Sequence, residues 1–215
     1  MDKATLLEKT RIINKLIQRA AGNPVDFEEM AKVLQLAVLA NCYIVGRRGK
    51  ILGYSFMDHF ACGTMEEIVL RSERFPESYN EGLMKVTETV TNTCQVGNGC
   101  VFNCNEPCHF TNKLTTVVPV LGGGERVGTL VLAKYDEEFK EDDLVLAEYG
   151  ATVVGMEILR VKAERAEEEA RAPRLHHRRR ARSGPGQGAR PGRRRGDPRA
   201  HGGRDGRPGQ RQGLR

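Results

Sequence analysis

The chain has 215 residues, of which 29% are charged, 39% hydrophobic and 6% aromatic, with a formal net charge of +6. That length allows one domain of ordinary size and an extension. No stretch approaches the ~18 apolar residues needed to span a bilayer, and the N-terminus lacks the apolar segment of a secretory signal. We therefore expect a cytoplasmic protein without a membrane partner, whose six cysteines are reduced.

The net charge is the sum of two parts of the chain that have opposite net charges. Residues 172–215 contain 14 Arg, 2 Asp and no Lys, a net charge of +12, whereas residues 1–171 carry −6. The basic part is also rich in Gly and Pro, so it cannot bury enough apolar surface to offset chain ordering. We expect it to be disordered. Because Arg, Gly, Pro and Ala all have GC-rich codons, out-of-frame reading of a GC-rich gene explains this composition better than a selected basic arm.

Two amphipathic helices are expected at the start of the chain. Apolar residues recur at helical spacing over 5–21, and Gly22 ends the pattern. A second helix is expected over about 27–40, where Asp26 and Glu29 have the spacing of a capping box.

A first hairpin follows, formed by strands 42–45 and 51–56 around the basic turn 47–50. Residues 65–70 have a helical pattern. The polar, cysteine-rich stretch 85–113 predicts no regular element.

A second hairpin and one long helix complete the pattern. Residues 115–121 and 127–133 are β-branched and almost continuously apolar, around the glycine turn 122–124. Pro119 cannot donate a ladder hydrogen bond, so it predicts an edge position or a bulge. The acidic run before 141–171 suits a helix N-terminus, and the later part of that helix is charged on all sides. The whole predicts an α+β fold with helices to one side of the sheet.

Five long stretches of the chain carry a family resemblance: KTRIIN (9–14), RRGKILGYS (47–55), RFPE (74–77), LTTVVPVLGGGERVGTLVLAKY (114–135) and DDLVLAEYGATVVGMEILR (142–160). With them, the chain resembles the CodY family over about residues 5–170. Members of that family are similar in having a GAF sensor domain, a long linker helix and a C-terminal winged helix-turn-helix that binds operator DNA. The resemblance implies a transcriptional repressor responsive to GTP and a branched-chain amino acid.

The resemblance also implies a domain organisation. We expect a GAF-type antiparallel sheet with flanking helices at 1–140 and a linker helix at 141–171 that supports a homodimer. The segment 172–215 stands where a winged helix-turn-helix would begin, and no such pattern is found there. We therefore expect this chain to lack the DNA-binding domain.

The resemblance implies two effector sites. For GTP, three cations in the first hairpin turn would face a polyanion, although from composition alone a solvated hairpin tip is the favoured interpretation. For the amino acid, an apolar sleeve is expected; the arginine that holds the carboxylate in the family aligns with Thr64, and a threonine-like partner with Cys100. The GTP positions are Val25, Phe27, Arg47, Arg48, Lys50, Glu157 and Lys162, and the amino-acid positions are Thr64, Met65, Ile68, Phe75, Pro76, Tyr79, Cys100 and Phe102.

The remaining motifs leave alternatives open. Cys94, Cys100, Cys104 and Cys108 come close to the spacing of a structural zinc site, but small buried or loop thiols are the favoured interpretation, so no metal is expected. No nucleophile arrangement or catalytic motif is found, and we expect no enzyme. The rival function is a stand-alone sensor or dimerisation module whose basic tail binds any polyanion.

Overall fold

The computed structural model describes residues 4–19, 25–58, 60, 62–94, 100, 102, 110 and 112–180. The chain divides into a unit up to Pro173 and a second unit from Arg174. The sheet and the helices packed on it belong to the first unit. The disorder predicted for the basic segment lies outside the described residues from 181 on, while residues 172–180 continue the last helix beyond its predicted end at 171.

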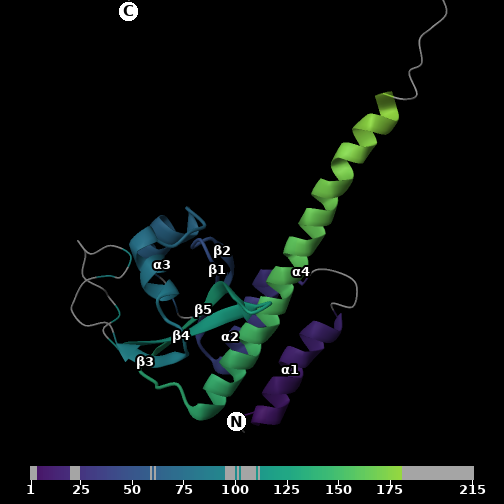
Figure 1. The fold of residues 1–215 in the computed structure, drawn as a ribbon. Helices are drawn as coiled ribbons and strands as arrows, with labels where there is room; N and C mark the ends of the chain where they lie inside the picture. Colours follow the sequence, from purple (N-terminus) through teal and green to yellow (C-terminus); the bar gives the residue numbers. More distant parts are fainter. Residues whose placement is uncertain are drawn as a thin grey trace, which may run out of the picture. The chain divides into compact units, whose positions relative to one another are not determined.

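A five-stranded antiparallel sheet forms the centre of the fold (Figure 1). Its order is β2-β1-β5-β4-β3, so each hairpin predicted from the sequence is present and the two hairpins meet through β1 and β5. The strands are β1 (Asn41–Gly46), β2 (Ile51–Ser55), β3 (Val90–Cys94), β4 (Lys113–Gly122) and β5 (Glu125–Tyr135).

One face of the sheet is covered by α1 (Leu6–Arg19), α2 (Phe27–Val38) and α4 (Glu141–Arg180). All three helices were predicted. Figure 1 shows α1 running beside α4, where the Tyr149 hydroxyl donates a hydrogen bond to Asn14 Oδ1. Asp26 caps α2 by accepting from the Glu28 N–H at 3.1 Å. Aliphatic side chains from every one of these elements fill the core between the helices and the sheet.

The opposite face is covered by a π-helix, η1 (Met65–Leu70), and by α3 (Glu77–Met84). The expectation that helices lie to one side of the sheet is therefore wrong. Neighbouring side chains of β1 explain the difference, because Ile44 packs in the core under α1, α2 and α4, whereas Val45 packs in the second core with η1. A strand whose successive residues are all buried requires cover on both faces.

The second hairpin turns at Gly123 and Gly124, both with positive φ (62° and 81°), as predicted. β4 is an inner strand, yet its pairing with β3 reaches only to Val117, so Pro119 lies beyond it. The ladder with β5 shifts register immediately after Val120. The proline thus occupies a locally unpaired side of the strand beside a bulge, as its missing N–H requires.

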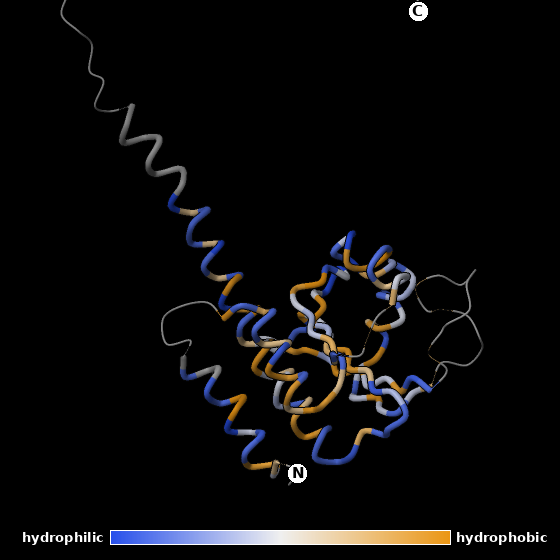
Figure 2. Tube along the Cα trace, turned by 180° about the vertical axis from the view of Figure 1, so that it is seen from behind, coloured by the Kyte–Doolittle hydropathy of each residue, from blue (hydrophilic) through white to orange (hydrophobic). Residues whose placement is uncertain are grey.

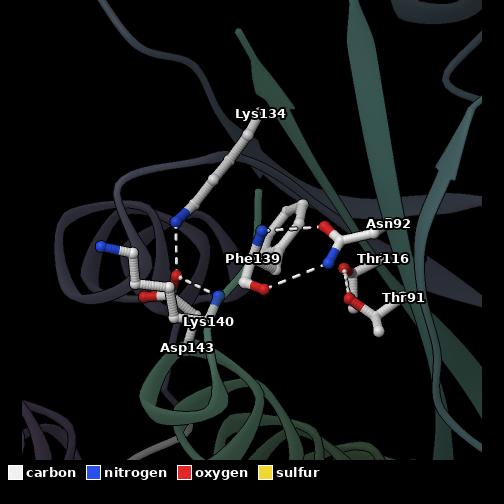
Figure 3. A network of polar contacts seen from close by, with 7 residues as sticks. All are labelled: Thr91, Asn92, Thr116, Lys134, Phe139, Lys140 and Asp143. Atoms are coloured by element: carbon white, nitrogen blue, oxygen red, sulfur yellow. Dashed lines mark hydrogen bonds and ion pairs between the residues drawn. The ribbon is translucent and has the colours of Figure 1, made fainter. Parts of the chain in front are cut away.

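A polar network joins β3 to the start of α4 (Figure 3). Asn92, with a φ of +51°, accepts from the Phe139 N–H at 2.8 Å and donates to the Phe139 carbonyl at 3.1 Å. Lys134 of β5 donates to Asp143 at 2.5 Å, and the same carboxylate oxygen accepts from the Lys140 N–H at 3.1 Å. Both charged side chains are buried, so the pair fixes the first turn of α4 against the sheet.

The burial of the α4 side chains changes along the helix. Its buried positions end at Ile158, and the described side chains from Lys162 to 171 are all exposed. Figure 2 shows this part of the helix as mostly hydrophilic. Among the helices that the structure describes, none combines the length and apolar character needed to cross a bilayer.

Candidate functional site

An aromatic pocket lies on the sheet face that η1 and α3 cover. Its empty volume is about 480 Å³, open solvent at the mouth included. Side chains from β1, β4 and β5 form one wall, and η1, α3 and the loops around them form the other. The described lining residues are Tyr43, Phe60, Cys62, Met65, Phe75, Tyr79, Cys100, Phe102, Phe110, Lys113, Thr115, Val131, Ala133 and Tyr135.

Aromatic rings contact one another along the wall of this pocket. The Phe75 ring lies 5.2 Å from Tyr79 and 5.5 Å from Phe102, and Tyr79 meets Phe102 edge-on at 5.2 Å. Burial raises the pKa of Tyr79 to about 12, and burial is also the main reason that the pKa of Tyr43 lies well above its ordinary value. Both phenols are neutral near pH 7, as ordinary tyrosines are, and keep a hydroxyl that can donate a hydrogen bond.

Five of the eight predicted amino-acid positions line this pocket: Met65, Phe75, Tyr79, Cys100 and Phe102. Ile68 packs in the core behind it. Thr64 and Pro76 stand immediately before η1 and α3, respectively, and are not lining residues. Their alignment with family positions does not bring them to the pocket wall.

Sequence reasoning missed the sheet side of the pocket. Lys113 and Thr115 of β4, Val131 and Ala133 of β5, and Tyr43 of β1 all face it. The sequence could have indicated these strand residues, because alternate residues of a strand point to one face of the sheet. Once Val117 is assigned to the pocket side, Thr115 and Lys113 follow on the same face.

A separate groove lies where α2, the first hairpin and α4 meet. Its empty volume is about 730 Å³, again including open solvent. Lys50 and Arg165 bring positive charge to it, and Glu28 and Glu73 bring negative charge. Its described lining residues are Phe27, Glu28, Lys50, Ile51, Leu52, Gly53, Tyr54, Leu70, Glu73 and Arg165.

Of the seven predicted GTP positions, Phe27 and Lys50 line this groove. Val25 and Glu157 meet directly, since the Val25 N–H donates to Glu157 Oε1 at 2.9 Å. That carboxylate is buried and also accepts two hydrogen bonds from Arg160, at 3.0 and 2.7 Å.

The other three positions, Arg47, Arg48 and Lys162, are exposed and do not line the groove. Arg165, one helical turn beyond Lys162, lines the groove and was not predicted from the sequence.

Hydrogen bonds tie the basic turn to the wall of the aromatic pocket. The Gly49 carbonyl accepts from the Phe75 N–H at 2.9 Å, and the Ile51 N–H donates to the Glu73 carbonyl at 2.8 Å. Side chains add to this: Arg74 donates to the Arg48 carbonyl at 2.6 Å. Gly49 has a φ of +81°, a conformation that favours glycine at this contact.

The cysteines form no metal site in the part of the chain that the structure describes. Cys94 is exposed and Cys100 is buried in the aromatic pocket, while Cys104 and Cys108 lie outside the described residues. Burial raises the pKa of the Cys42 thiol far above its ordinary value, which leaves it an inert core residue.

Known proteins are similar to this chain in sequence. A family model described as the CodY GAF-like domain matches residues 5–175. The global transcriptional regulator CodY of Clostridium botulinum (strain Hall) is 47% identical over 168 residues, which cover 78% of this chain and 65% of that protein. The protein of the same name from Clostridium kluyveri is 46% identical over the same coverage. The chain thus spans 65% of the length of these curated relatives.

Two solved structures are similar to parts of this chain. The cofactor-binding GAF domain of the nutrient sensor CodY from Clostridium difficile is 37% identical, with a TM-score of 0.49 over 73% of this chain and 99% of that one. The bacteriophytochrome RpBphP3 of R. palustris, only 11% identical, has a TM-score of 0.55 over 87% of this chain and 45% of that one, a likeness of fold alone. With most of its length matched by the family model, the chain belongs to the CodY family, and its five-stranded sheet with flanking helices is the GAF-like domain of that family.

Proposed function

We propose that this chain is the effector-sensing part of a global transcriptional regulator, binding a branched-chain amino acid in the aromatic pocket and GTP at the groove beside the basic turn. The aromatic pocket is the observation that carries the proposal. Its lining of aromatic rings, Met65 and Val131 suits a small aliphatic side chain. The curated relatives are named transcriptional regulators, so binding rather than catalysis is the proposed activity.

The groove supports the nucleotide part of the proposal. Phe27 and Tyr54 offer faces on which a base can stack, and Lys50 and Arg165 reach the groove from the hairpin turn and from α4. Arg47 and Arg48 add exposed positive charge at the same turn. Ammonium and guanidinium groups converging on one groove are suited to the phosphates of a nucleotide.

Calorimetric titration of the whole chain tests both effectors. We expect binding of isoleucine, leucine or valine, and of GTP in preference to ATP. Lys50→Gln should weaken GTP about tenfold, the effect of losing one charge-assisted contact, and leave the amino-acid affinity unchanged. Lys15→Gln removes an exposed lysine of α1 and should change neither. If neither effector binds the wild-type chain, the sensing proposal is wrong.

A second candidate function rests on the basic segment 172–215, whose net charge of +12 suits nonspecific binding of a polyanion. The first function is the sensing part of a homodimeric repressor of a family that binds operator DNA, and its rival is a stand-alone sensor with a polyanion-binding tail. Fluorescence anisotropy with operator and scrambled duplexes across a salt series separates them. Equal affinity for both duplexes, falling steeply with salt, supports the rival. A preference for operator that persists at physiological salt supports the first.

A further inference from the structure

The lining of the aromatic pocket is chemically uneven. Rings, thiols and aliphatic groups make up most of it, with Thr115 and the tyrosine hydroxyls as neutral polar groups. Among the described lining residues Lys113 carries the one formal positive charge, and none carries a negative charge. A pocket with this lining suits a ligand that has an apolar body, and it presents one cationic side chain to that ligand.

The position of Lys113 is set by the sheet. It is the first residue of β4 and pairs with Tyr135 of β5, which also lines the pocket. Residues 113, 115 and 117 alternate onto the pocket face, and Val117 is buried in the core there. The lysine is thus held at the rim by a regular strand rather than by a loop.

The described residues around Lys113 give its positive charge little electrostatic compensation. Its Nζ lies 5.9 Å from the centroid of the Phe102 ring, and its side chain is half-buried. No carboxylate forms an ion pair with it within the described part of the chain. A cation partly removed from water and facing a ring quadrupole gains from a bound anion, because attraction between charges strengthens where water is excluded.

We infer that Lys113 binds the carboxylate of the ligand held in this pocket, so that the pocket selects monocarboxylates with a small apolar body. The inference rests on the proposed amino-acid function for the site, and it assigns the carboxylate to a strand residue that the sequence did not single out. Phe75, Phe102 and Val131 would then surround the apolar body.

Calorimetry on the whole chain tests this with three variants and two ligands. Lys113→Gln should weaken isoleucine binding at least tenfold, whereas Lys113→Arg, which keeps the charge, should stay within a few-fold of wild type. Isoleucinamide has no carboxylate, and it should bind wild type and Lys113→Gln with equal affinity. Lys15→Gln on α1 is the matched control. Thermal unfolding of each variant verifies that it is folded.

The outcomes separate the two proposals. If wild type binds isoleucine and Lys113→Gln binds it equally well, the role of Lys113 is wrong while the sensing function stands. If isoleucine, leucine and valine do not bind, the chain is titrated with isovalerate, phenylalanine and 3-methyl-2-oxopentanoate. Binding of one of these that Lys113→Gln abolishes supports the carboxylate site and removes the branched-chain amino-acid function. Binding of none of them overturns the inference.

Discussion

Replacing Lys134 by methionine is expected to lower the free energy of unfolding by about 3–5 kcal/mol, the usual result of leaving one member of a buried ion pair alone. Lys134 and Asp143 are 7% and 6% exposed and lie 2.5 Å apart. Methionine fills a similar volume, so the destabilisation comes from the uncompensated Asp143 carboxylate rather than from a cavity. The Lys134 ammonium also lies 4.9 Å from the centroid of the Phe139 ring, and methionine cannot replace this cation–π attraction.

Chemical denaturation of matched variants measures this effect. Arg171→Met breaks an ion pair with Glu167 whose side chains are 77% and 69% exposed, so its cost should stay below about 1 kcal/mol. Adding Asp143→Asn to Lys134→Met removes the stranded charge and keeps an oxygen that can accept from the Lys140 N–H. The double variant should therefore recover part of the stability. A cost for Lys134→Met no larger than that for Arg171→Met would contradict the buried-pair interpretation.

A second large effect is expected at Gly155 of α4. A Cβ added there would lie 2.0 Å from the Leu121 carbonyl oxygen, so the helix and β4 would have to separate. We expect Gly155→Ala to destabilise the fold by about 3 kcal/mol, near the upper end of overpacking effects, despite the better helix propensity of alanine.

Gly82 of α3 supplies the control for this substitution. It is also a helical glycine, it is exposed, and a Cβ added there meets nothing within 4 Å. Gly82→Ala should therefore be neutral or should stabilise by up to about 1 kcal/mol. Thermal unfolding of both variants, with circular dichroism to follow the helices, gives the comparison. Equal midpoints for the two would mean that α4 does not approach β4 as closely as the structure has it.

The predictable part of this fold is the part with regular hydrophobic spacing. The helices on the α4 side and both hairpins follow from periodicity, and the acidic first turn of α4 marks where that helix begins. β3 and α3 were not predicted. β3 reads VTNTC, is largely exposed and contains Asn92 with positive φ, so neither alternation nor burial marks it. Its place in the sheet depends on partners distant in sequence, such as the Asn92–Phe139 hydrogen bonds.

The candidate site could likewise be predicted only in part. The resemblance located one wall of the pocket through Met65, Phe75 and Tyr79, of which Phe75 lies in a matched stretch and Tyr79 two residues after it. It gave no sign of Lys113, whose importance comes from what surrounds it after folding rather than from its sequence neighbours. Nor could spacing tell that Arg165, and not Lys162, reaches the groove, since that depends on how α4 crosses the first hairpin.

The hydrogen bonds between the basic turn and segment 73–80 have a thermodynamic consequence. The Gly49 carbonyl accepts a hydrogen bond from the Phe75 N–H, and the Phe75 side chain lines the pocket. A shift of the Phe75 backbone would therefore strain the turn that carries Lys50. Free-energy linkage then requires reciprocity: if an occupant of the pocket changes the affinity of an anion at the turn by some factor, the anion changes the affinity of that occupant by the same factor. An occupant of the pocket and an anion at the turn would in this way be coupled through these hydrogen bonds, without a change in the fold.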